Sequence, residues 1–242
     1  MRLLEQWRDD WGVLRAMLRG MPRSGAQQVR LEHFYGQQAA DYDRFRQRLL
    51  PGRSELIAAL PIEPGVRIVE LGAGTGSNVG LFSPAQQQYS QFELVDLCRP
   101  LLAEAQRAHG HKGNVQLIEA DASTYQPKQP ADLVLMSYSL SMMPTPEAVV
   151  ANALRMLRPG GLLAVVDFYL SEARVAPNRV QHNAFERLFW SRWFAHDGVM
   201  LGPQRLSLLQ ASFGDIVLSE RRHRLPYLPL LRVPYFLFRG RA

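Results

Sequence analysis

The sequence has one cysteine, two lysines and no long run of apolar residues. Because Cys98 is the only cysteine, an internal disulfide and a multi-thiolate metal site within one chain are excluded. The six histidines show no HExxH-like pairing, so we expect no metal site. No stretch approaches the ~20 apolar residues that a membrane-spanning helix needs, and the charged N-terminus does not resemble a secretory signal. We therefore expect a cytoplasmic protein.

The positive charge is concentrated at the C-terminal end of the chain. The net charge is +6, and residues 219–242 hold six arginines against the single acid Glu220. Residues 61–218 are slightly acidic, with twelve bases against fourteen acids. A basic C-terminal region can meet the phosphates of nucleic acid or an anionic membrane surface. It can equally consist of solvated strand ends, and the sequence leaves both interpretations open.

Alternating apolar segments predict the core of the fold. Five β-branched or apolar runs predict strands at 66–72, 91–97, 114–121, 131–137 and 162–168. Helical patterns lie between them at 77–82, 99–109 and 146–157. Because strands and helices alternate, we expect a parallel sheet with helices on both faces.

The pattern changes after the fifth strand. Helices are predicted at 178–194 and 203–212, followed by strands at 215–222 and 232–241. We expect the last strand to lie at a sheet edge or to be an antiparallel hairpin partner, because Pro234 cannot donate a ladder hydrogen bond. The predicted fold is a Rossmann-like α/β domain with a seven-stranded, mostly parallel sheet. We divide the chain into a helical cap (1–60), a core (61–170) that binds a nucleotide-like ligand, and a helical insertion with closing strands (171–242).

A glycine-rich turn follows the first predicted strand. Gly72, Gly74 and Gly76 alternate with other residues between a strand and a helix. Such a turn lets the backbone approach a ligand at the carboxyl edge of a sheet. The G-x-G-x-x-G spacing of dinucleotide-binding proteins would require glycine at Ser77. The loop therefore favours a nucleoside ligand other than a dinucleotide.

Acidic residues end the next two strands. Asp96 lies twenty residues beyond Gly76, where a carboxylate can accept the hydroxyl hydrogens of a ribose. Asp121 ends the third strand. Together with the glycine turn, these acids resemble the S-adenosylmethionine site of class I methyltransferases. The resemblance implies S-adenosylmethionine as methyl donor, S-adenosylhomocysteine as product, and donor contacts from Glu70, Gly72, Gly74, Gly76, Asp96, Leu97, Asp121, Ala122 and Ser137. It places Asp121 near the adenine amino group and Glu70 near the methionine portion.

The segment after the fourth predicted strand gives information on the molecule that would accept the methyl group. Residues 137–144 read SYSLSMMP, not the Asn/Asp-Pro-Pro-Tyr/Phe pattern of enzymes that methylate bases, so we expect no nucleic-acid partner. Segments of the chain resemble the N-methyltransferases of betaine-lipid synthesis, namely 34–53, 137–144, 165–169, 189–194 and 225–238. The resemblance implies trimethylation of the homoserine amine of diacylglyceryl-homoserine. It also implies a separate aminocarboxypropyl transferase as a partner.

An amine acceptor needs a pocket that tolerates growing positive charge, for which aromatic faces and one carboxylate suffice. We expect Tyr35, Tyr42 and Tyr138 as catalytic pocket walls or hydrogen-bond partners, and Asp167 as the carboxylate near the amine. Core packing for the tyrosines and loop capping for Asp167 are the structural alternatives. His182 is either a proton acceptor or a structural histidine.

Aromatic and basic residues share one predicted helix. Phe185, Leu188, Phe189 and Arg192 fall on one face beside Trp190, Trp193 and Phe194. Such a helix can lie on a membrane surface, or it can pack on the core with both tryptophans inside. Three functions remain: a lipid-headgroup N-methyltransferase peripheral to a membrane, a methyltransferase of a soluble or quinone-like small molecule, and a non-catalytic adenosylmethionine-binding partner subunit.

Overall fold

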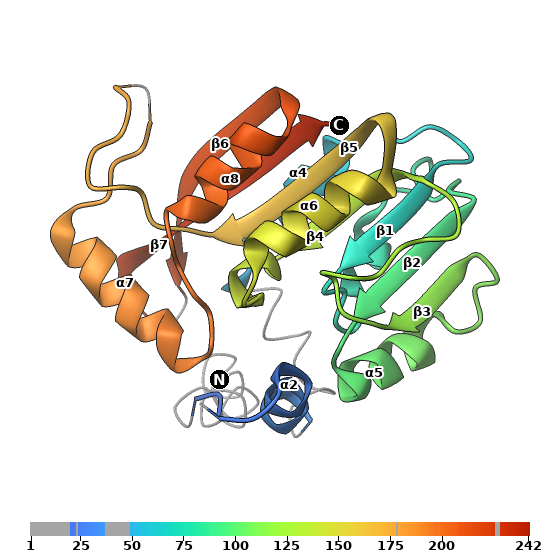
Figure 1. Ribbon diagram of the computed structural model, residues 1–242, viewed down its shortest axis with the longest axis horizontal. Coiled ribbons are helices and arrows are strands. Elements are labelled where there is room, and N and C mark those ends of the chain that lie inside the picture. The colour runs from blue at the N-terminus through green and yellow to red at the C-terminus, as the bar shows by residue number, and fades with distance from the viewer. Residues whose placement is uncertain (1–19, 23, 37–48, 178, 226–227) are drawn as a thin grey trace, which may run out of the picture.

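The computed structural model describes residues 20–22, 24–36, 49–177, 179–225 and 228–242. Its centre is a seven-stranded sheet in the order β3-β2-β1-β4-β5-β7-β6 (Figure 1). The first five strands are mutually parallel, and β7 is antiparallel to both β5 and β6. The expected Rossmann-like α/β fold is confirmed. The strands are β1 Arg67–Leu71, β2 Gln91–Asp96, β3 Val115–Glu119, β4 Ala131–Ser137, β5 Leu157–Phe168, β6 Gly214–Leu225 and β7 Leu228–Arg241.

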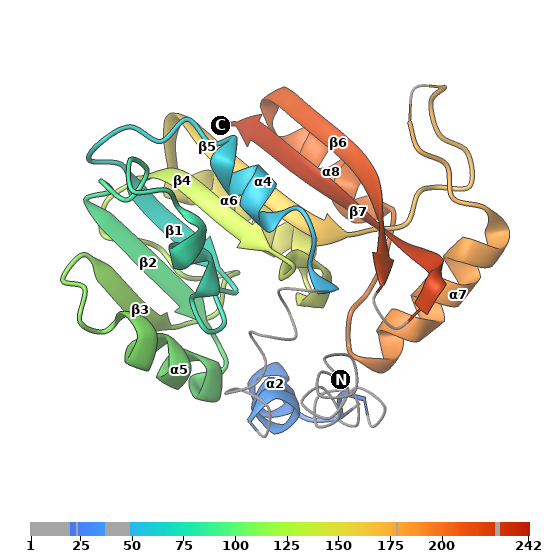
Figure 2. The ribbon, with the colours of Figure 1, turned by 180° about the vertical axis from the view of Figure 1, so that it is seen from behind.

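Helices cover both faces of the sheet, and a hydrophobic cluster lies under each layer. One cluster joins the sheet to α6 and α8, and the other joins it to α4, η1, α5 and α7. Figures 1 and 2, taken from opposite sides, show α6 and α8 on one face and α4 on the other. The bounds are α4 Arg53–Ala58, η1 Ser77–Leu81, α5 Arg99–His109, η2 Leu140–Met142, α6 Pro146–Met156, α7 Ala184–His196 and α8 Gln204–Ser212. No helix within the described ranges is long and apolar enough to cross a membrane.

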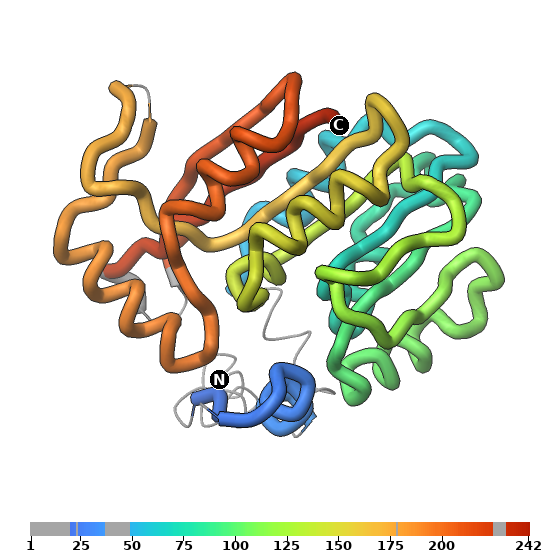
Figure 3. Tube along the Cα trace, in the orientation of Figure 1, coloured from blue at the N-terminus to red at the C-terminus, as the bar shows by residue number. Residues whose placement is uncertain are grey.

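One further helix lies off the carboxyl ends of the central strands. The Cα trace in Figure 3 shows α2, Gln27–Tyr35, apart from the sheet and close to α5. Two amide side chains tie α2 to the core: Gln27 Nε2 donates to the Met142 carbonyl (3.2 Å) and Gln28 Nε2 donates to Glu119 Oε1 (2.9 Å). Helix α2 therefore covers the sheet edge at which the glycine turn lies.

The helix predicted from residue 178 begins later, at Ala184, and this part of the prediction is wrong. Asn183 forms a capping box with Glu186: Asn183 Oδ1 accepts the Glu186 N–H (2.8 Å), and Glu186 Oε2 accepts the Asn183 N–H (3.0 Å). These bonds satisfy two backbone donors at the helix start and so fix its first residue.

The C-terminal strand is the hairpin partner of β6, as expected, but it does not lie at the edge. Strand β7 lies between β5 and β6, and β6 is the edge strand. Pro234 is tolerated because its carbonyl faces the β5 side, where it accepts the Tyr169 N–H (3.4 Å) just past the last register pair, Phe168 with Tyr235. Because the β5–β7 register ends before this position, no hydrogen bond of that ladder requires the N–H group that proline lacks.

Candidate functional site

A cavity opens at the carboxyl edge of the sheet, beneath α2. Its walls come from the turn after β1, the ends of β2, β3 and β4, and one face of α2. The lining residues include Gln27, Leu31, Tyr35, Gly72, Gly74, Asp96, Leu97, Cys98, Leu101, Asp121, Ala122, Tyr138, Ser139, Met142, Met143 and Thr145. Open parallel sheets bind ligands at this edge.

The glycine turn forms the floor of the cavity. Gly72 has φ +73°, and a Cβ at this position would overlap the side chain of Ser139, whose Oγ donates to the Leu71 carbonyl (2.7 Å). Gly74 also has a positive φ, +59°. Only glycine adopts this backbone without strain, so the turn approaches a ligand with no side chain in between.

Asp96, at the end of β2, holds the turn in place. Its Oδ2 accepts the Gly74 N–H (2.7 Å) and its Oδ1 accepts the Cys98 N–H (2.8 Å). A carboxylate has about four acceptor positions, so the same group can also accept hydroxyl hydrogens from a ligand. Asp96 thus fixes the loop geometry and presents negative charge to the cavity.

Three other predicted donor residues line the cavity beside Asp96. Leu97 and the buried Ala122 supply apolar walls. Asp121 Oδ1 accepts hydrogen bonds from the backbone N–H and the hydroxyl of Ser123, both at 2.7 Å, which orients the carboxylate in a turn after β3. The structure brings these residues together at one cavity, and their contact with the donor stays a prediction.

Glu70, Gly76 and Ser137 lie behind the lining. The buried Glu70 accepts from Asn78 Nδ2 (2.6 Å), and the Oδ1 of Asn78 accepts from Arg53 (3.2 Å). Gly76 has φ +69°, and a Cβ there would lie 2.8 Å from Leu94, so its role is close packing of the turn. Ser137 is buried at the end of β4. These three residues are therefore absent from the cavity lining, and their contact with the donor stays a prediction.

Two of the predicted tyrosines reach the cavity. The Tyr35 hydroxyl donates to Met142 Sδ (3.2 Å), and the Tyr138 hydroxyl donates to the Pro51 carbonyl (2.6 Å). Tyr138 has φ +54°, a strained conformation for a bulky residue that is typical of functional sites. Tyr42 lies outside the described residues.

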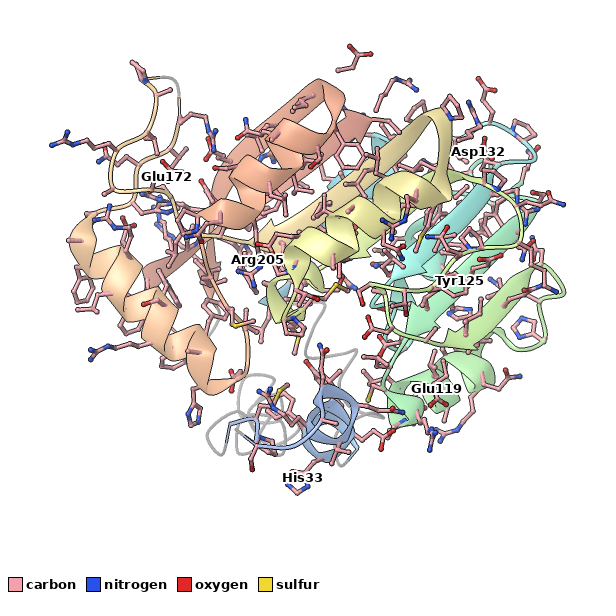
Figure 4. All side chains as sticks on the ribbon, viewed as in Figure 1. His33, Glu119, Tyr125, Asp132, Glu172 and Arg205 are labelled. Carbon is pink, nitrogen blue, oxygen red and sulfur yellow. The ribbon has the colours of Figure 1, made fainter. Side chains whose placement is uncertain are left out.

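Asp167 is not in the cavity lining. It is buried at the end of β5, where it accepts hydrogen bonds from the Ser141 backbone (2.8 Å), the Ser141 hydroxyl (2.7 Å) and the Phe168 backbone (2.8 Å). Burial raises the pKa of its carboxyl to about 6 despite these bonds. Arg205, near the start of α8 (Figure 4), donates to the Leu140 carbonyl (3.3 Å). Both side chains hold η2, the segment that carries Met142.

His182 is also remote from the cavity lining. It is fully buried, its Nδ1 accepts the Ser171 N–H (3.0 Å), and its ring packs against Tyr169 with a centroid distance of 5.0 Å. Burial lowers the pKa of its imidazole to about 4. The geometry matches the structural alternative for this histidine.

Sequence reasoning missed two lining residues on α2. Gln27 and Leu31 lie two turns and one turn before Tyr35, so all three face the cavity. Their i, i+4, i+8 spacing indicates one shared helix face, but no local feature of the sequence indicates what this face covers.

The lining chemistry restricts the ligand. Among the described residues that line the cavity, none is Arg or Lys. A phosphate-bearing dinucleotide would lack charge partners there, whereas a nucleoside with ribose hydroxyls and no phosphate suits the glycine turn and Asp96. The residues therefore fit S-adenosylmethionine.

The chain matches a family model described as a methyltransferase domain over residues 37–201. Among curated proteins, it is 31% identical over 109 residues to the ubiquinone/menaquinone biosynthesis C-methyltransferase of Shewanella pealeana, covering 43% of each chain. It is 30% identical over 127 residues to the trans-aconitate 2-methyltransferase of Methylobacterium nodulans, covering 52% of this chain and 48% of the relative. The match thus spans less than half the length of these relatives.

Solved structures show the same fold at low sequence identity. Phosphoethanolamine N-methyltransferase 2 of Haemonchus contortus, in complex with S-adenosyl-L-methionine, superposes with a TM-score of 0.68 at 15% identity, covering 91% of this chain and 60% of that one. The N-methyltransferase NodS of Bradyrhizobium japonicum, in complex with S-adenosyl-L-homocysteine, gives a TM-score of 0.58 at 14% identity, covering 88% and 98%.

Proposed function

The chain belongs to the class I S-adenosylmethionine-dependent methyltransferases, and from this premise we propose that it methylates the homoserine amine of diacylglyceryl-homoserine to a trimethylated betaine lipid. The cofactor is S-adenosylmethionine, which leaves as S-adenosylhomocysteine. The acceptor would be supplied by a separate aminocarboxypropyl transferase. The observation that carries the choice of an amine is the cation-free, aromatic and thioether lining of the described cavity.

In this proposal the donor lies along the carboxyl edge of β1 and β2. Gly72 and Gly74 allow close approach of the backbone, Asp96 accepts the ribose hydroxyls, and Leu97 and Ala122 flank the adenine. Asp121 accepts from the adenine amino group. When bound, S-adenosylmethionine supplies an activated methyl group on a sulfonium, so the protein mainly has to align the acceptor and exclude water.

The acceptor end of the cavity is assigned to the segment between α2 and η2. Tyr35 and Tyr138 offer aromatic groups and Met142 a polarisable sulfur, which suit a neutral amine that becomes cationic. An arginine or lysine there would repel the product. Because Asp167 is tied to Ser141, we assign it a positioning role through η2 and not a contact with the amine. Of the described part of residues 1–60, we assign the role of cap to α2, because α4 packs on a face of the sheet.

A soluble or quinone-like acceptor is the second candidate, favoured by the names of the two curated relatives. Tyr35, Tyr138 and the two methionines would also pack against an aromatic ring. The absence of Arg and Lys from the described lining disfavours a tricarboxylate such as aconitate.

The test offers isotopically labelled S-adenosylmethionine with two acceptor pools, diacylglyceryl-homoserine vesicles and an extract of water-soluble metabolites and quinones. We expect label in mono-, di- and trimethylated lipid by mass spectrometry. Label confined to the extract would contradict the lipid acceptor and support the second candidate. Donor binding without label in any pool would indicate a non-catalytic binding subunit. The Gly72→Ala variant, in which the turn is blocked, controls for label that does not depend on the cavity.

A further inference from the structure

We propose that α7 and the adjoining end of the β6–β7 hairpin form a docking face for an anionic lipid bilayer. The docking face comprises Phe185, Leu188, Phe189, Trp193, Arg222, Arg224 and Arg232. The docking face is separate from the cavity, and its role does not depend on which acceptor is methylated.

The outward side of α7 carries exposed apolar side chains together with the exposed Arg192. Eight large hydrophobic side chains of the described residues are exposed, and three of them lie on this helix: Phe185 (65% exposed), Leu188 (54%) and Trp193 (41%). The Phe189 ring stacks between those of Phe185 and Trp193, with centroid distances of 5.8 Å to each. The spacing i, i+4, i+8 makes this a continuous aromatic row along the helix.

Packing against the core explains only the middle ring of the row, because the half-buried Phe189 packs against the core cluster whereas Phe185 and Trp193 are exposed. The opposite side of α7 attaches the helix to the core through Trp190 (1% exposed) and Phe194 (9%). The helix therefore already has a buried apolar side and carries a second, exposed one. The alternative in which both tryptophans lie inside holds only for Trp190, because Trp193 is exposed. Contiguous exposed aromatic surface of this kind marks an interaction site.

Arginines line the hairpin beside this row. Arg224 lies directly across from Arg232 in the β6–β7 register, and Arg222 projects on the same face two residues earlier. Like charges directly opposite one another on a sheet are destabilising. Glu186 is the only acid within residues 184–196, and it is engaged in the capping box and in an ion pair with Arg222 (3.3 Å). Anions from outside the protein would therefore stabilise the pair formed by Arg224 and Arg232.

The aromatic row and the arginines meet in one groove. A cavity of about 250 Å³ lies between α7 and the hairpin, lined by Phe185, Glu186, Phe189, Trp190, Arg222, Leu231 and Arg232. Aromatic rings that enter the headgroup boundary, with arginines that reach phosphates beside them, are the composition of an interfacial helix. Lipid phosphates would relieve the repulsion between the arginines. This charge complementarity favours an anionic bilayer as the partner of the docking face.

The position of the docking face is compatible with access to the cavity. Both ribbon views place α7 at one end of the molecule and β3 at the other, with α2 at the edge between them (Figures 1 and 2). A bilayer that contacts α7 therefore leaves the glycine turn and the donor cavity uncovered.

The test is flotation of the full chain with vesicles of phosphatidylcholine alone or mixed with phosphatidylglycerol, at low salt and without acceptor lipid. We expect binding to the mixed vesicles only. The double variant Phe185→Ser/Trp193→Ser should lower partitioning at least about tenfold. The double variant Arg224→Gln/Arg232→Gln should lower it by roughly fivefold for each arginine. Matched controls are Leu154→Ser, an exposed apolar residue on α6, and Arg107→Gln on α5, and both should bind as the parent chain does.

Two results would overturn the docking face: no binding of the parent chain to mixed vesicles, or docking-face variants that bind as well as the controls. A concentration-dependent dimer in sedimentation velocity that Phe185→Ser/Trp193→Ser abolishes would also overturn it, since the face would then join two copies of the chain. Calorimetric titration of each variant with S-adenosylhomocysteine separates these outcomes from failure of the proposed function, because the vesicles contain no acceptor and the cavity is unchanged.

Discussion

Asp96→Asn perturbs the donor site with the least change in shape. The carboxylate accepts the N–H groups of Gly74 (2.7 Å) and Cys98 (2.8 Å), so an amide NH₂ group must face one of these donors. A hydrogen bond to a charged group contributes about 1.5–3 kcal/mol, and 1.4 kcal/mol is a factor of ten in affinity. We expect the dissociation constant of S-adenosylhomocysteine to rise roughly ten- to hundredfold.

The assay is isothermal titration calorimetry, accompanied by urea unfolding of the same samples. Asp132→Asn is the matched control, because Asp132 also accepts a backbone N–H, from Arg67 (2.8 Å), and is paired with Arg158, but at the opposite edge of the sheet from Glu119 (Figure 4). It should lower stability without changing donor affinity. An Asp96→Asn variant that folds and binds S-adenosylhomocysteine as tightly as the parent chain would show that Asp96 does not hold the donor site.

Three further predictions address the turn, the buried histidine and the pocket wall. Gly72→Ala forces a Cβ onto Ser139 at φ +73° and should reduce donor affinity more than about tenfold in calorimetry, whereas Gly65→Ala, at φ +86° with open space, should not. Because burial lowers the pKa of His182 to about 4, the unfolded state binds more protons at this group below about pH 6.5, and the contribution of His182 to the unfolding free energy should fall by roughly 2 kcal/mol as pH drops from about 6.5 to 4. The raised pKa of Asp167 acts in the opposite direction, so urea titrations at each pH should show the His182 loss as a difference between the parent chain and His182→Gln. Tyr138→Phe should cost about 1 kcal/mol of stability and leave donor affinity unchanged, and an unchanged unfolding midpoint would contradict its bond to the Pro51 carbonyl.

The sequence predicted the features that depend on local pattern. Apolar runs placed the parallel strands, and the glycine spacing after β1 located the turn, because buried strands and positive φ angles both restrict residue type locally. Asp96, Leu97, Asp121 and Ala122 follow strand ends, so topology alone brings them to one edge.

Features set by long-range packing were not predictable in this way. Asp167 lies at a strand end like Asp96, but its carboxylate is turned to Ser141, twenty-six residues earlier, and no local signal separates the two acids. The place of Pro234 within β7 depends on where β5 ends. By contrast, the Asn183–Glu186 capping box was readable, although the apolar pattern extended the expected helix past it.

A crystal structure with S-adenosylhomocysteine would show whether the cavity under α2 holds the methyl donor. We predict that the ribose hydroxyls of the ligand bind the Asp96 carboxylate and that its adenine lies between Leu97 and Ala122. The backbone of the glycine turn should contact the ligand directly. Density for the ligand away from Gly72 and Asp96, or no binding at saturating concentration, would contradict this prediction.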